Sequence, residues 1–180
     1  MRAGRNDIDL SEVIKNTGVK PGQTALDFGC GSGTYTIPLA SVVGNQGKVY
    51  ALDKDRGALD ALMRRASSAK LTNIERIDAG GGAQIDLANN SVDVALLFDV
   101  FHFYYFSSRG ERHELLSEIS RVLKPDGLLS VYPKHMETEA RAEIESAGFS
   151  LEDELSINLI HNETNPERGQ LLNFKKQPAE

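Results

Sequence analysis

A short apolar segment that runs into three alternating glycines constrains this chain more than any other feature. Residues 24–28 read Thr-Ala-Leu-Asp-Phe, and glycine follows at positions 29, 31 and 33. Glycine lets the backbone turn sharply, so a ligand can lie against bare amides at the start of the helix that follows. Open parallel sheets bind ligands beyond the carboxyl ends of their strands. The segment therefore predicts an α/β sheet with a nucleotide-type cofactor site.

Two carboxylates flank this turn. Asp27 lies in the apolar segment itself, and Asp53 closes the next apolar run, about 20 residues after Gly33, the interval at which an acidic side chain meets a ribose. Thr34 stands where a dinucleotide fingerprint would place its third glycine. Carboxylates oppose a phosphate and favour a cation, so the pair weakens a pyrophosphate interpretation. The alternative is a tight turn that binds no ligand.

Apolar runs alternate with amphipathic segments along most of the chain, which predicts one doubly wound, mostly parallel sheet with helices on both faces. Two helices are expected from Asp9 to about Gly18 and from Gly33 to near Gly44. A third is expected over the amphipathic stretch that begins around Leu59 and ends near Lys70, and a fourth over the stretch from about Leu115 to Leu123. A C-terminal antiparallel pair is expected because no helix separates its two segments. The strands are expected at 24–28, 49–52, 74–77, 92–98, 128–132, 149–160 and 169–175. Residues 1–180 are predicted to form a single domain with a short helical segment at about 8–18.

The two acids and the glycine turn resemble the first two motifs of the class I S-adenosylmethionine (SAM)-dependent methyltransferases, and most closely their small-molecule and quinone-methyltransferase branch. The likeness covers nearly the whole chain, including the turn Leu-Lys-Pro-Asp-Gly at 123–127. It implies a seven-stranded α/β sheet in the order 3-2-1-4-5-7-6. It also implies transfer of a methyl group from SAM to a small molecule, with S-adenosylhomocysteine as the product.

The resemblance assigns cofactor-binding roles residue by residue. The loop would hold the methionine and sugar part of SAM, Asp53 the ribose, and Asp78 with the amide of Ala79 the adenine. The carbonyl of Phe98 would receive the ammonium group, and the ring of Tyr35 would lie near the sulfonium. The predicted cofactor-binding set is Asp27, Gly29, Cys30, Gly31, Gly33, Tyr35, Asp53, Lys54, Asp78, Ala79 and Phe98.

His102 is the candidate catalytic residue, because a histidine often follows the fourth strand in this branch of the family. It would act either as a general base or as a wall of the substrate pocket, and the alternative is a histidine packed among aromatic neighbours. His135 could overlook the same pocket from the opposite side, whereas His113 and His161 are expected to face solvent. None of the four histidines stands at metal-ligand spacing, so no metal is predicted.

The composition of the chain excludes several kinds of substrate and binding partner. A net charge of -6 and a pI near 5.3 argue against nucleic acid, and the Pro-Pro motif of amino-group methylation of DNA is absent. The lone Cys30 excludes an internal disulfide and the several thiols that arsenite methylation needs. No apolar run is long enough for a membrane span and no signal-peptide core is seen, so the cytoplasm is expected, with a small-molecule substrate. A homodimer is compatible with the sequence.

Two further interpretations stay open. Only 26 residues precede Asp27, so the helices with which relatives cover their substrate are mostly missing. That brevity favours a non-catalytic methyltransferase-like subunit that binds SAM and serves a partner. The other interpretation is an NAD-dependent oxidoreductase, which Thr34 and the terminal antiparallel pair oppose.

Overall fold

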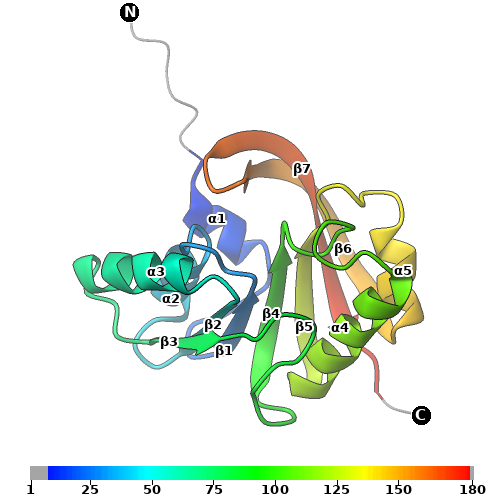
Figure 1. The fold of residues 1–180 in the computed structure, drawn as a ribbon, viewed down its shortest axis with the longest axis horizontal. Coiled ribbons are helices and arrows are strands. Elements are labelled where there is room, and N and C mark those ends of the chain that lie inside the picture. Colours follow the sequence, from blue (N-terminus) through cyan, green and yellow to red (C-terminus); the bar gives the residue numbers. More distant parts are fainter. Residues whose placement is uncertain (1–7, 179–180) are drawn as a thin grey trace, which may run out of the picture.

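Seven strands form one sheet in the order β3-β2-β1-β4-β5-β7-β6, in a computed structural model that describes residues 8–178 (Figure 1). Strands β1 to β5 pair in parallel, whereas β7 runs antiparallel to both β5 and β6. The predicted order and the antiparallel pair are confirmed. The strands are β1 (Thr24–Phe28), β2 (Lys48–Asp53), β3 (Ile74–Asp78), β4 (Val92–Phe98), β5 (Leu123–Tyr132), β6 (Phe149–His161) and β7 (Asn165–Lys176).

Helices cover both faces of the sheet, as predicted. Helices α1, α2 and α3 pack on one face and α4 and α5 on the other (Figure 1). Neighbouring residues of β4 show the two cores, because Leu96 lies in the cluster under α2 and α3 whereas Leu97 lies in the cluster under α4 and α5. Within the described residues, no helix is long and apolar enough to cross a lipid bilayer. The helices are α1 (Leu10–Lys15), α2 (Thr36–Val43), α3 (Arg56–Ser68), α4 (Arg109–Val122) and α5 (Ala140–Ser146).

The start of β5 and the presence of α5 differ from the sequence prediction. Leu123 was expected on the helix but begins β5, so residues 124–127, expected as a turn, belong to this strand. Leu123 pairs with Val92, and the register then shifts between Val92 and Val94. Helix α5, seven residues that bury Ala140 and Ile144, was not predicted. A helix this short carries too few apolar repeats to be recognised by periodicity.

The terminal pair of strands is longer than predicted. Strand β6 continues to His161 and β7 begins at Asn165, so most of the expected polar loop is strand. The full length of these strands was not predicted, because polar residues occupy the exposed strand positions near the turn. The long hairpin arches over the carboxyl edge of the sheet (Figure 1), and its turn therefore reaches the region where parallel sheets bind ligands.

Candidate functional site

A cavity of about 520 Å³ lies at the carboxyl ends of β1, β2 and β4, and the turn of the β6–β7 hairpin closes one side of it. Its size suits a cofactor or small ligand. Eight of the predicted cofactor-binding residues line it: Gly29, Cys30, Gly31, Tyr35, Asp53, Lys54, Ala79 and Phe98. The other lining residues are Phe28, Thr34, Leu52, Asp55, Ala58, Gly81, Gly82, Asp99, Val100, Tyr105, Phe106, Ile160, Asn162 and Glu163.

The glycine loop after β1 has a backbone that only glycine adopts readily. Gly29, Gly31 and Gly33 have φ values of 74°, 55° and 91°. A Cβ atom on Gly29 would lie 2.7 Å from Val100 Cγ2, and one on Gly33 would collide with the buried side chain of Leu62. Glycine is therefore needed here both for the turn and for close packing. Gly33 packs against Leu62 of α3 and does not line the cavity.

Asp53 links the end of β2 to the glycine loop. One carboxylate oxygen accepts a hydrogen bond from the Gly31 N–H at 2.8 Å, and the other accepts from the Asp55 N–H at 2.9 Å. Two carboxylate oxygens offer about four lone-pair positions, so the side chain can still accept from a ligand. Asp53 thus lies beside the glycine loop on the cavity wall, and its ribose-binding role stays a prediction.

Asp27 is buried just beneath the loop. Its side chain is 2% exposed and accepts a hydrogen bond from the Thr36 hydroxyl at 2.6 Å. Burial raises the pKa of Asp27 to about 6, although the Thr36 hydrogen bond opposes the shift. Cys30 is also buried, which raises the pKa of its thiol and agrees with a packing role.

Carboxylates outnumber cations among the charged side chains of the cavity wall. Asp53, Asp55, Asp99 and Glu163 line it, whereas Lys54 is the single lysine or arginine among the described lining residues. The Lys54 ammonium lies over the ring of Tyr105, 5.4 Å from its centre. A negative wall attracts a cationic ligand and repels a phosphate.

The hairpin turn is joined to the glycine loop and to the start of α2, which sequence reasoning missed. The Tyr35 hydroxyl accepts from the Ile160 N–H at 2.7 Å and lies 3.1 Å from the Ile160 carbonyl. Glu163 accepts from the Ser32 N–H at 2.6 Å. Tyr35 also packs edge-to-face against Phe98, with ring centres 4.7 Å apart. Among residues 8–178, the end of β6 and this turn line the cavity, whereas no residue of α1 does.

The structure does not bring the side chain of Asp78 into the cavity. Arg76 holds this carboxylate with two hydrogen bonds, of 2.6 and 3.1 Å, and this pairing lowers the pKa of Asp78. The N–H of Ala79 donates to the Asp53 carbonyl at 2.9 Å. Residues two apart on a strand point to the same side, so the sequence held a signal for the Arg76–Asp78 pair.

His102 is buried, with both ring nitrogens engaged by its own loop. Nε2 lies 3.2 Å from the Asp99 carbonyl oxygen, and Nδ1 lies 3.3 Å from the Tyr104 N–H. Burial lowers the pKa of His102, while nearby Asp99 opposes the shift. The ring does not line the cavity but packs against Tyr105, which does, at a centre-to-centre distance of 4.8 Å.

The exposure of the other three histidines agrees only partly with the prediction. His113 is exposed on α4, as expected. The expectation that His161 faces solvent is wrong, because its side chain is 15% exposed and its Nδ1 lies 2.6 Å from an Asp99 oxygen. His135 stacks edge-on against both His102 and His161, with ring centres 5.3 Å apart in each case. Spacing along the chain could not reveal this cluster, because its members come from three separate segments.

The sheet order, the closing antiparallel hairpin and the acid-flanked glycine loop define the class I methyltransferase fold. Residues 25–127 match the family model described as "Methyltransferase domain", and the chain belongs to this family. A solved SAM-dependent methyltransferase from Aquifex aeolicus superimposes with a TM-score of 0.78 at 25% identity, over 93% of this chain and 89% of the other. The cyclase SpnF superimposes with a TM-score of 0.74 at 14% identity, over 94% and 81%.

A curated relative from Bacillus mycoides, a demethylmenaquinone methyltransferase, is 31% identical over 116 residues. These residues are 64% of this chain and 46% of the relative. The chain thus matches about half the length of that protein. Because SpnF is a cyclase on the same fold, the fold does not by itself fix the reaction.

Proposed function

We propose that this protein binds SAM and transfers its methyl group to a small apolar acceptor of the quinol type. The carboxylate-lined cavity carries the proposal, because SAM is a cation without phosphates. The names of the relatives, a demethylmenaquinone methyltransferase and a SAM-dependent methyltransferase, point the same way.

The residues present fit SAM. The positive-φ glycines leave a loop without side chains beside Asp53, which keeps free lone pairs for two ribose hydroxyls. Tyr35 and Phe98 place aromatic rings at the cavity wall, where a sulfonium is stabilised by the ring faces. The backbone near Ala79 and Gly81 is left to border the adenine, since Asp78 is held by Arg76.

When bound, SAM supplies an activated methyl group, so the protein needs mainly to align the acceptor and exclude water. The end of the β6–β7 hairpin, through Ile160 and Glu163, forms one side of the cavity. Tyr105 and Phe106 offer a flat aromatic surface on the wall, next to the exposed ring of Tyr104. Such a surface suits an apolar ring.

In this proposal His102 supports the pocket wall from behind through Tyr105 and does not act as a general base. Both of its nitrogens are occupied by backbone groups, and its ring supports Tyr105. A general base would need a free nitrogen within hydrogen-bond reach of the acceptor. The proposal also includes a small molecule rather than nucleic acid as the partner; a homodimer and residence in the cytoplasm stay predictions.

The test is methyl transfer from isotopically labelled SAM to demethylmenaquinol, with catechol and small amines as comparison acceptors. We expect label in the quinol product and inhibition by S-adenosylhomocysteine. Binding of SAM without transfer to any acceptor would favour the non-catalytic partner subunit instead. Absence of both binding and transfer would overturn the proposal.

A further inference from the structure

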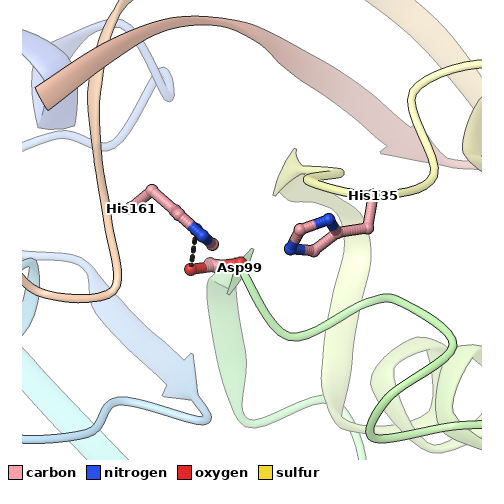
Figure 2. Close-up of side chains that lie close together, drawn as sticks. All are labelled: Asp99, His135 and His161. Carbon is pink, nitrogen blue, oxygen red and sulfur yellow. Dashed lines mark hydrogen bonds and ion pairs between the residues drawn. The ribbon is translucent and has the colours of Figure 1, made fainter. Parts of the chain in front are cut away.

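Three side chains that could ligate a metal converge beside the cavity (Figure 2). Asp99 follows β4, His135 follows β5, and His161 ends β6. One carboxylate oxygen and two imidazole nitrogens all lie within 4.8 Å of one another. We propose that Asp99, His135 and His161 bind a divalent transition-metal ion, with Zn²⁺ or Fe²⁺ as the favoured class.

The Asp99 carboxylate is only half satisfied without a cation. Its Oδ2 is 2.6 Å from His161 Nδ1 and 3.2 Å from the Asn162 N–H. Its Oδ1 is buried and has no hydrogen-bond partner, and Nε2 of His102 lies 3.7 Å from it, beyond hydrogen-bond distance. Buried carboxylate oxygens are nearly always hydrogen-bonded or bound to a cation. An ion beside Asp99 would supply the missing partner.

The backbone also points to a site at these positions. Asp99 and His135 adopt left-handed conformations, with φ values of 56° and 68°. Non-glycine residues in this region cost conformational energy and gather at ligand sites. In both cases the conformation directs a ligating side chain toward the cluster (Figure 2).

The donor set selects the kind of ion. Two imidazoles and one carboxylate suit Fe²⁺ or a catalytic Zn²⁺, whereas Ca²⁺ and Mg²⁺ prefer oxygen ligands. Metal–ligand bonds of about 2.0–2.2 Å require the three donors to approach one another to roughly 3–3.5 Å. His135 is exposed and can swing inward.

A neighbouring amide can hold the ring of His161. Its Nε2 lies 2.9 Å from the side-chain nitrogen of Asn162. When Nδ1 ligates a metal, Nε2 carries the proton, and a flipped Asn162 amide accepts it. This outer hydrogen bond is the usual companion of a metal-bound histidine.

An ion at this site would lie next to the cofactor cavity, where it could contact the methyl acceptor. Asp99 also lines the cofactor cavity, so the remaining coordination positions are open to an oxygen atom of the acceptor. That role rests on the proposed function, whereas binding of the ion does not.

The experiment titrates the tag-free, chelator-treated full chain with Co²⁺ and Zn²⁺, in the absence of SAM and acceptor. We expect one bound ion per chain and visible Co²⁺ absorption bands. His135→Ala should weaken binding by about a hundredfold or more, since losing even an outer-sphere partner costs ten- to a hundredfold. His113→Ala, which removes an exposed histidine of α4, should bind as the parent does.

Circular dichroism checks that each variant is folded. His161→Ala is a second variant that should also lose the ion; if it unfolds, His135→Ala decides the question, because His135 is exposed. Absence of stoichiometric binding by the parent, or parental affinity in His135→Ala, would overturn the site. Because no methyl transfer is measured, failure of the metal site and failure of the proposed function are distinguishable.

Discussion

Replacement of Asp53 by alanine is expected to weaken binding of S-adenosylhomocysteine by about 1.5–3 kcal/mol, or roughly ten- to a hundredfold. The variant loses the acceptor for two ribose hydroxyls. It also frees the Gly31 and Asp55 amides that the carboxylate now holds at 2.8 and 2.9 Å. The ribose hydrogen bonds are made only in the complex, and hydrogen bonds to a charged group are the stronger kind. The two amide hydrogen bonds belong to the protein itself, so their loss loosens the glycine loop.

Calorimetric titration measures this effect, and circular dichroism checks the fold. Asp86→Ala is the matched control, because Asp86 is an exposed carboxylate outside the cavity. Parental affinity in Asp53→Ala would show that Asp53 does not contact the cofactor. An unfolded variant would show that its role is to stabilise the glycine loop.

Asp27→Asn is expected to stabilise the fold at neutral pH while weakening cofactor binding. The folded-state pKa of about 6 exceeds the ordinary value of 3.8, so the folded protein retains the Asp27 proton more strongly than the unfolded chain does. The contribution of Asp27 to stability therefore falls as the pH rises from about 4 to 6. Above that window the buried charge costs about 3 kcal/mol, at 1.36 kcal/mol per pH unit.

Asparagine keeps an oxygen for the Thr36 hydroxyl and removes the charge. We expect the free energy of unfolding at pH 8 to rise by about 1–3 kcal/mol, with little difference from the parent at pH 4. Urea unfolding at both pH values measures this, and the difference between variant and parent cancels the titration of other carboxyls. A variant less stable than the parent at pH 8 would contradict the account.

The loop and the sheet could be predicted because their signals are local. The alternating glycines, the apolar strands and the acids at their ends each follow from a few neighbouring residues. Asp53 reaches the Gly31 amide as a consequence of parallel pairing between β1 and β2. A motif of this kind fixes both the fold and the position of the cavity.

The hairpin cover and the histidine cluster could not be predicted in the same way. Polar side chains on β6 and β7 read as loop, although they extend the arch that brings Glu163 to Ser32. Asp99, His135 and His161 meet only because three segments end near one point of the sheet edge. Such contacts depend on tertiary geometry, which periodicity and residue spacing do not reveal.

The central claim is that the carboxylate-lined cavity selects SAM and its product, which carry no phosphates, over phosphate-bearing nucleotides. Calorimetric titration of the parent protein with S-adenosylhomocysteine, SAM, NAD and ATP tests it most directly. We expect SAM and S-adenosylhomocysteine to bind with micromolar-range affinity, and NAD and ATP to give no measurable heat of binding. Tighter binding of NAD than of S-adenosylhomocysteine would contradict the account.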